Sequence, residues 1–305
     1  MRRRNFLRTG LAASATAVLP LFQPLSRTFA QANAAKKPKK ILYFTKNSGF
    51  GSSEHEPVKI RNGGLSVSDT ALKKLGAANN WEVVCTKDGK IFDGDLKQFD
   101  CFAFYTSGDL CQGDNALSPE GKKRFLAAIE DGVGFFGFHT ASLTCKSFNE
   151  IDIDPYITML GGEFITHGPS QVATVKVTQP AQIPWLKNKG ESFEYFDEWY
   201  ALRKFNKDMR VILTLDTASM KDKVWSPGNV YVGYDRTPFP VHWARMHGKG
   251  RVMYTALGHP DDFWQDASWM EFVRDCFGWV LGEYNMDMMP NIDKVAPGAF
   301  QYPIE

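Results

Sequence analysis

Short apolar runs alternate with helix-like segments along the first half of the chain. The runs are apolar at consecutive positions, which is typical of strands covered on both faces, as in a parallel sheet. Four such runs are present, at residues 41–45, 81–86, 101–106 and 132–139. Between them, residues 66–80 and 118–132 have the apolar spacing of helices, and Ser118 followed by Pro119 is a typical helix start. This alternation predicts a doubly wound α/β domain.

The second half of the chain has a different pattern. Further strand-like segments occur at residues 171–179, 210–216, 240–246 and 250–257. The last two are joined by His247, Gly248, Lys249 and Gly250, which predicts a β-hairpin with a tight turn. Residues 268–282 have a strongly amphipathic pattern that predicts a closing helix.

The first 32 residues have the pattern of a cleaved export signal. A basic head precedes a mildly apolar stretch, and the small residues Ala30 and Ala32 are typical of a cleavage site. Arg3 and Arg4, with the following Asn5-Phe6-Leu7-Arg8, resemble the twin-arginine export motif. We therefore expect a periplasmic or secreted protein exported by that route. The expected organisation is a signal at residues 1–32, a linker at 33–39, a domain at 40–284 and a C-terminal surface tail at 285–305.

Charge, hydropathy and cysteine content exclude several classes of function. Of 36 basic side chains, five are arginines of residues 1–32, so the rest of the chain carries 31 basic and 34 acidic side chains. That balance argues against a nucleic-acid partner. After Lys40 no apolar run approaches the length of a membrane span. Five cysteines without a CxxC pair predict neither a disulfide framework nor a zinc ribbon. Cys111 and Cys145 follow strands and could pair or react, but a passive role is the preferred interpretation.

Polar side chains directly follow several of the predicted strands. In an open parallel sheet, ligands bind at the carboxyl ends of the strands, where loops bring such side chains together. His55 follows the first strand, Ser107 and Asp109 the third, His139 the fourth, and His259 the last. We therefore expect these groups to converge at one edge of the sheet.

Two more segments contribute to this candidate site. His167 lies just beyond a Gly-Gly turn, and we group it with the three strand-end histidines. Glu194, Asp197 and Glu198 lie among aromatic residues, which suits a sugar-binding cleft, although an ordinary solvated acidic face is the alternative. The expected substrate-binding residues are Ser107, Asp109, Tyr200 and Trp243.

Four motifs stand in the order found in the ThuA-like (trehalose utilisation) family, which the sequence resembles. They are GFHTA at 137–141, YITMLGGEFITH at 156–167, DEWY at 197–200 and PVHWARMHGKGRVMYTALGH at 240–259. The resemblance implies a flavodoxin-like three-layer sandwich with a mostly parallel central sheet, similar to class I glutamine amidotransferases. In those relatives a turn after a strand presents a nucleophilic cysteine. Here His139 stands in that place, so glutaminase chemistry is not expected unless Cys145 has taken over the role.

The resemblance implies carbohydrate metabolism, with 3-keto-glycosides as a substrate class. A ketone at C3 acidifies the proton on C2, a base removes that proton, and elimination, hydrolysis or isomerisation can follow. The family's acidic motif makes Glu198 the leading general base, with Asp197 as the less favoured neighbour and His139 as a second catalytic group. The alternative is a non-catalytic sugar-binding module.

Several imidazoles at one edge of a sheet could hold a divalent metal ion. Strand-end placement and the family resemblance together indicate that Zn²⁺, Ni²⁺ or Fe²⁺ is bound by His55, His139, His167 and His259. In the rival arrangement, without metal, the histidines form hydrogen bonds to the sugar or transfer protons. We expect a small carbohydrate as the partner and no nucleotide cofactor.

Overall fold

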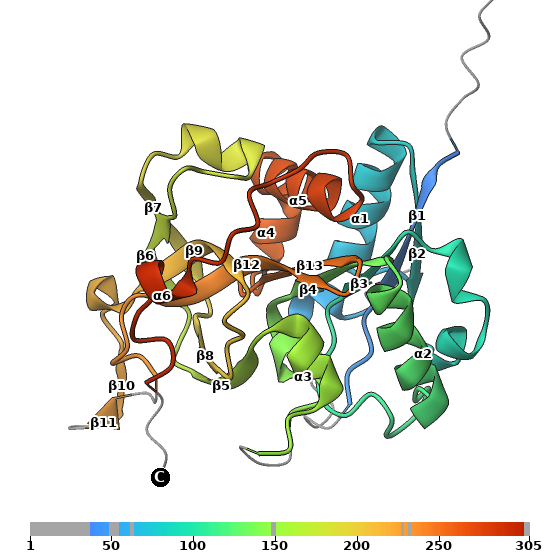
Figure 1. Ribbon diagram of the computed structural model, residues 1–305, viewed down its shortest axis with the longest axis horizontal. Helices are drawn as coiled ribbons and strands as arrows, with labels where there is room; N and C mark the ends of the chain where they lie inside the picture. Colours follow the sequence, from blue (N-terminus) through green and yellow to red (C-terminus); the bar gives the residue numbers. More distant parts are fainter. Residues whose placement is uncertain are drawn as a thin grey trace, which may run out of the picture. The chain divides into compact units, whose positions relative to one another are not determined.

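The structure is a computed structural model that describes residues 37–48, 55–61, 64–147, 151–226, 229–230 and 233–301. The export signal expected at residues 1–32 lies outside the described residues. Within the described part of the chain, nine strands form one sheet in the order β2-β1-β3-β4-β13-β12-β9-β6-β7 (Figure 1). Helices lie on both sides of this sheet, so the fold is mixed α/β.

The parallel half of the sheet confirms the strands expected from the first apolar runs. Its members are β1 (Lys39–Phe44), β2 (Trp81–Thr86), β3 (Cys101–Phe104), β4 (Gly134–Phe138) and β13 (Gly250–Thr255). Each adjacent pair in this half is parallel. Because β13 pairs with β4 in parallel, the loops after both strands leave the sheet at the same edge.

The other half of the sheet is antiparallel. It contains β12 (Phe239–His247), β9 (Arg210–Asp216), β6 (Gln171–Val177) and β7 (Ser192–Asp197). The β12–β13 hairpin confirms the predicted turn, with His247 opposite Gly250. Within the described residues the large sheet therefore has four parallel and four antiparallel pairings, which corrects the expectation of a mostly parallel sheet. Two small sheets pair β5 (Glu163–His167) with β8 (Tyr200–Arg203), and β10 (Val224–Ser226) with β11 (Asn229–Val230).

Three of the six helices in the described residues, α1, α2 and α5, match the segments that the sequence predicts as helical. Ser66 and Ser118 cap the first turns of α1 and α2 with their hydroxyl groups, and Pro119 occupies the first position of α2. The helices are α1 (Val67–Ala78), α2 (Pro119–Glu130), α3 (Pro155–Leu160), α4 (Asp261–Gln265), α5 (Ala267–Val280) and α6 (Ile292–Val295). In Figure 1, α1, α4 and α5 lie on one side of the sheet and α2 and α3 on the other. Both faces of the parallel strands are thus covered, which explains their continuous apolar runs.

The C-terminal segment packs along the antiparallel half of the sheet. Asn291 accepts from the backbone N–H of Val211 at 2.7 Å and donates to the carbonyl of Val211 at 3.0 Å. The segment also contains the one-turn helix α6, which the sequence does not predict. No helix in the described residues has the length and hydropathy needed to cross a membrane.

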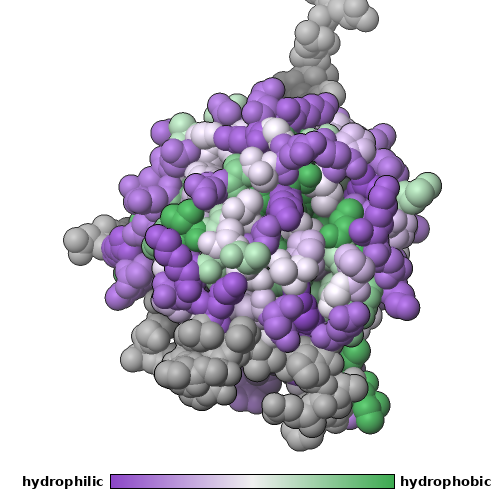
Figure 2. All heavy atoms as spheres, turned by 90° about the vertical axis from the view of Figure 1, so that its left-hand side faces the viewer, coloured by the Kyte–Doolittle hydropathy of each residue, from purple (hydrophilic) through white to green (hydrophobic). Residues whose placement is uncertain are grey.

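The outer face near β6 and β7 is mainly polar. Figure 2 shows the described residues of this face as mostly hydrophilic, with hydrophobic side chains in small separate groups. Val172 and Phe196 are half exposed and face each other across β6 and β7. Small scattered apolar groups of this kind are normal for a protein surface.

Candidate functional site

A tight turn after β4 presents His139. The strand ends at Phe138, and His139 begins the 3-10 helix η4 (His139–Leu143) with φ of 42°, in the left-handed region that side chains other than glycine seldom adopt. Small residues permit the turn, because a Cβ added to Gly137 would lie 3.1 Å from the Cβ of Ala141. Strained backbone of this kind is found at functional sites, where the surrounding structure fixes it.

Hydrogen bonds and ring packing orient the buried imidazole of His139. Its Nδ1 lies 2.7 Å from the carbonyl oxygen of Ala256. Because a carbonyl can only accept, Nδ1 carries a proton and donates it. The hydroxyl of Tyr254 donates to the backbone carbonyl of His139 at 2.8 Å, and the ring of Tyr200 lies 4.1 Å from the imidazole. These contacts leave Nε2 of His139 directed at Nδ1 of His259, 3.3 Å away.

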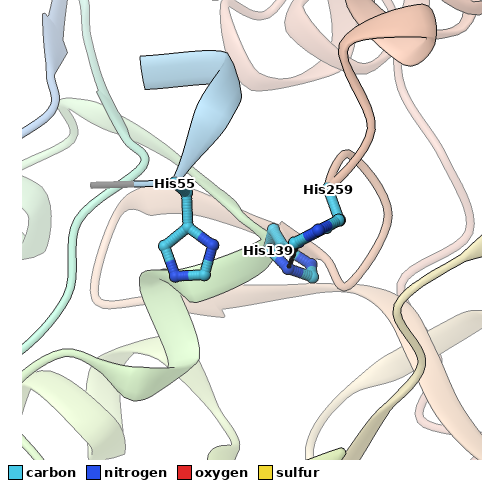
Figure 3. Close-up of side chains that lie close together, drawn as sticks. All are labelled: His55, His139 and His259. Atoms are coloured by element: carbon cyan, nitrogen blue, oxygen red, sulfur yellow. Dashed lines mark hydrogen bonds between the residues drawn. The ribbon is translucent and has the colours of Figure 1, made fainter. Parts of the chain in front are cut away.

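His55 and His259 complete a cluster of three imidazoles (Figure 3). His55 comes from the segment before the 3-10 helix η1 (Glu56–Val58), and His259 from the loop after β13. One ring nitrogen from each of the three histidines lies within 4.8 Å of the other two. The ring of His55 stands edge-on to those of His139 and His259, with centroids 5.8 and 5.7 Å apart. The structure therefore brings together three of the four histidines grouped by sequence.

Burial keeps two of these imidazoles uncharged at neutral pH. For His55, burial and then the neighbouring imidazoles lower the pKa to about 3. For His259, burial followed by His139 lowers the pKa to about 4. The carboxylate of Glu198 opposes both shifts without overcoming them. Neutral imidazole is the form that binds metal ions, so His55 and His259 have the protonation state that a metal ligand needs.

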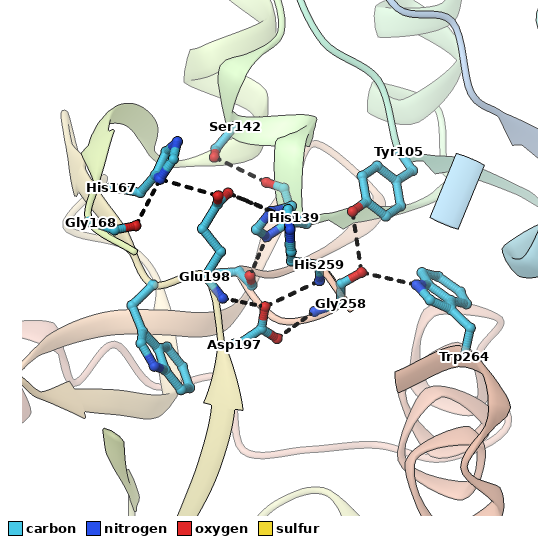
Figure 4. Close-up of polar contacts among 12 residues, drawn as sticks. Tyr105, His139, Ser142, His167, Gly168, Asp197, Glu198, Gly258, His259 and Trp264 are labelled. Carbon is cyan, nitrogen blue, oxygen red and sulfur yellow. Dashed lines mark hydrogen bonds and ion pairs between the residues drawn. The ribbon is translucent and has the colours of Figure 1, made fainter. Parts of the chain in front are cut away.

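Glu198 lies between the imidazole cluster and His167 (Figure 4). Its Oε2 is 3.4 Å from Nε2 of His139 and 3.4 Å from Nδ1 of His259. Its Oε1 is 3.2 Å from Nδ1 of His167. His167 is the last residue of β5, in the small β5–β8 sheet. It therefore lies beside Oε1 of Glu198 and outside the cluster of His55, His139 and His259.

The carboxylate of Glu198 is ionised and incompletely paired. Burial alone would raise its pKa, but the neighbouring imidazoles, His139 foremost and then His259 and His167, outweigh burial and hold that pKa at about 2. Its Oε2 is buried and has no hydrogen-bond partner among the described residues. A buried oxygen without a donor is costly. A bound cation or a proton taken from a ligand would remove that cost.

Asp197 holds the loop that carries His259. Its Oδ2 accepts from the backbone N–H of Gly258 at 2.9 Å, and its Oδ1 accepts from that of Glu198 at 2.8 Å. Burial raises the pKa of Asp197 to about 6, although His139 and the backbone donors act in the opposite direction. With both oxygens occupied by backbone donors and no exposure to solvent, Asp197 supports the site and is poorly placed to contact a substrate.

Two aromatic residues that sequence analysis did not single out fix the same loop. The hydroxyl of Tyr105 donates to the carbonyl of Gly258 at 3.2 Å, and Nε1 of Trp264 donates to it at 3.0 Å. The ring of Tyr105 also faces His55 and His139. Tyr105 is the last residue but one of the third predicted strand, so its position near the carboxyl edge was the available signal; Trp264 had none.

The two aromatic residues predicted to bind substrate are both buried. Tyr200 is 1% exposed and packs against His139, so it orients that ring. Trp243 is fully buried, donates from Nε1 to the carbonyl of Leu160 at 2.9 Å and packs against Tyr254. In this arrangement Trp243 has no free polar atom or exposed surface for a sugar.

The two polar residues predicted to bind substrate after β3, Ser107 and Asp109, form hydrogen bonds with neighbouring loop residues. Ser107 is buried and donates to the side chain of Asn47. Asp109 is exposed, and its carboxylate accepts from the backbone N–H of Cys111 at 2.9 Å. These bonds stabilise the loops after β1 and β3.

Comparison with known families gives a match over most of the chain. Residues 40–280 match the ThuA family, which is described as trehalose utilisation. The chain belongs to this family. The match spans both the parallel and the antiparallel halves of the large sheet and includes every residue of the imidazole and carboxylate site.

Two solved structures resemble this ThuA family member in fold. A ThuA-like protein from Bacteroides uniformis is 22% identical, with a TM-score of 0.59, and the match covers 87% of this chain and 99% of that one. A ThuA-like protein from Parabacteroides merdae is 14% identical, with a TM-score of 0.55 and coverage of 81% and 91%. A comparison with curated proteins found no match.

Cys145 lacks the properties of a reactive nucleophile in this ThuA family member. The side chain is 5% exposed, and burial raises the pKa of its thiol to about 11, although Lys122 opposes the shift. A reactive cysteine needs a depressed pKa, because the thiolate is the nucleophile. Cys111 also has a raised pKa, chiefly through burial. Both side chains are free thiols in this structure.

Proposed function

We propose that this ThuA family member is a carbohydrate-processing enzyme that removes the C2 proton of 3-keto-glycosides. One observation carries the proposal: an ionised, buried carboxylate oxygen of Glu198 that lacks a hydrogen-bond donor lies 3.4 Å from two imidazoles. A sugar-binding surface has no need of such a group, whereas proton abstraction requires one. The trehalose-utilisation description of the family supports a sugar as substrate.

The residues present fit a divalent metal ion. Ligands about 2.0–2.1 Å from a tetrahedral ion lie about 3.4 Å apart, and Nε2 of His139 and Nδ1 of His259 are 3.3 Å apart. His55 supplies a third imidazole, and the orphaned oxygen of Glu198 is a counter-charge beside the three. We therefore propose that His55, His139 and His259 hold Zn²⁺, Ni²⁺ or Fe²⁺. When bound, such an ion would polarise the ketone oxygen of the substrate.

Different side chains would accept the substrate proton and pass it to solvent. Glu198 accepts the C2 proton, the C2–H electron pair forms the C2–C3 double bond, and the ketone oxygen takes up the negative charge. His167 contacts the far oxygen of Glu198 and has a side chain 42% exposed, so it can exchange the accepted proton with solvent. Asp197 and Tyr200 hold His259 and His139 in place. Elimination, hydrolysis and isomerisation share this first step.

A kinetic comparison of two glutamate variants tests the proposal. Purified protein would be incubated with 3-keto-trehalose or a 3-keto-glucoside, and free sugar, unsaturated product and isomer would be measured over hours. Glu198→Gln should lower the rate by about 10²–10⁴-fold, because removal of a positioned base has that effect. Glu194→Gln, an exposed change on the same strand β7, should leave the rate unchanged. Sugar binding without any product would instead support a non-catalytic module.

We further propose export of the protein by the twin-arginine route, with the signal at residues 1–32. The support is the Arg3-Arg4 pair with its following motif, since that pathway recognises the arginines themselves. Arg3→Lys combined with Arg4→Lys should abolish delivery to the periplasm while preserving charge. Normal periplasmic levels of this variant would contradict the proposed route.

We also propose that the fold is the flavodoxin-like three-layer sandwich of class I glutamine amidotransferases. Its support is the set of helices on both sides of the parallel strands. The turn at Gly137–Ala141, which places His139 after a central strand, is consistent with that relationship.

A further inference from the structure

A single arginine connects the two segments that carry His55 and His259. One guanidinium nitrogen of Arg61 lies 2.6 Å from Oε2 of Glu56, the residue after His55. Another lies 2.7 Å from Oδ2 of Asp261, two residues beyond His259. We propose that Arg61 is a positioning residue that sets the place of His55 relative to the other imidazoles and thereby the affinity of the site for metal. This inference rests on the metal site proposed above.

His55 depends on such a connection more than the other two histidines do. His139 and His259 follow β4 and β13, which pair in the middle of the large sheet. His55 instead precedes the three-residue helix η1, and its imidazole forms no hydrogen bond with another described residue. Its observed ring contacts are edge-on or tilted packing against His139, His259 and Tyr105.

The other hydrogen bonds of the segment that carries His55 are formed with parts of the protein other than the His259 loop. Ser68, in α1, donates to the carbonyl of Pro57 at 2.8 Å, and Lys87 donates to that of Val58 at 2.9 Å. These bonds fix η1 against α1 and the end of β2. Among the described side chains, Arg61 forms the ion pair that joins this segment to Asp261 at the start of α4.

The guanidinium group suits this role better than an ammonium group. Arginine presents several N–H donors in a fixed plane, so it can contact two carboxylates at once in a defined geometry, whereas lysine is a flexible point charge. Exposed ion pairs add little to global stability. The expected effect of Arg61 is therefore on the local position of His55 and not on folding of the domain.

Hydrogen exchange of the metal-free protein tests the connection itself. In Arg61→Ala, the backbone amides of residues 55–61, apart from Pro57, should exchange several-fold faster than in the wild type. Lys59→Ala is the matched control, because Lys59 also pairs with Glu56 but does not reach Asp261; its exchange should stay at the wild-type rate. Unchanged exchange in Arg61→Ala would overturn the positioning role, whether or not the protein binds metal.

A cobalt titration, followed by the visible absorption of bound Co²⁺, tests the consequence for the site. Arg61→Ala should raise the Kd for Co²⁺ by about tenfold, as loss of a supporting contact around a metal site does. Arg61→Lys should restore only part of the affinity, and Lys59→Ala should bind as the wild type does. Faster exchange with an unchanged Kd would overturn the link to affinity. If the wild type takes up no Co²⁺, the proposed metal site fails, and the exchange experiment alone decides the role of Arg61.

Discussion

Asp197 binds the backbone of His259 and not its imidazole. The Oδ1 atom of Asp197 accepts from the N–H of His259 at 3.2 Å. The imidazole of His259 is thereby left to face His139 and Glu198, at 3.3 and 3.4 Å. Asp197 and Glu198, at the end of β7, thus have separate structural roles. Asp197 holds the loop that carries His259, and Glu198 contacts the imidazoles of His139 and His259.

Replacing Asp197 by asparagine should therefore weaken the loop after β13. Asparagine has the same shape, but its amide N–H₂ would face a backbone N–H that now donates to a carboxylate. We expect a loss of about 1–3 kcal/mol in the free energy of unfolding, together with lower turnover. Urea denaturation checks the first effect. Asp262→Asn, an exposed change in the first turn of α4, should alter neither quantity.

The left-handed backbone of His139 predicts an unusual order of stability for two variants. Both His139→Gly and His139→Ala remove the imidazole, but glycine tolerates φ of 42° without the steric cost that alanine has. The glycine variant should therefore be more stable than the alanine variant by about 1 kcal/mol. At Ser142, within the same 3-10 helix but without a positive φ, the order should reverse. Equal stabilities at position 139 would argue against backbone strain there.

Metal content should separate His167 from the imidazole cluster. His55→Ala and His259→Ala should each lower bound metal strongly, because each removes one of three ligands. His167→Ala should retain metal, since His167 contacts Oε1 of Glu198 on the other side of the carboxylate. Elemental analysis of protein purified without chelator or a metal-affinity tag checks this. Little metal in the wild type, with activity that survives chelation, would leave the imidazoles as proton-transfer and hydrogen-bonding groups.

A buried histidine outside the site predicts a pH dependence of stability. Burial lowers the pKa of His242 to about 3, against about 6.5 in an unfolded chain. Between these values the unfolded state binds more protons, so stability is lost as the pH falls from 6.5 towards 3. From pH 6 to pH 4 the loss attributable to His242 should be about 2 kcal/mol.

Urea denaturation at several pH values measures this effect of His242. His242→Leu, which cannot take up a proton, should show a shallower loss of stability than the wild type over the same range. A slope equal to that of the wild type would show that His242 does not contribute.

Local sequence patterns determined the strands and helices of the parallel half. The continuous apolar runs, and the Ser66 and Ser118 caps, depend on residues that are close together in the chain. The rule that ligands bind at the carboxyl ends of parallel strands then predicted that His55, His139 and His259 meet. That prediction succeeded because two of these residues follow adjacent parallel strands, β4 and β13.

Only the tertiary structure decided which groups contact one another at the site. His167 and Glu198 come from β5 and the β7–β8 turn, in the part of the chain whose pairing is antiparallel, and no local pattern specifies how those strands lie against the β4 edge. The same holds for Trp243, whose alternating strand pattern does not reveal that its indole nitrogen is paired with Leu160. Hydrophobic periodicity is set by neighbours a few residues away, whereas a distance of 3.4 Å between Glu198 and His259 depends on the packing of the whole domain.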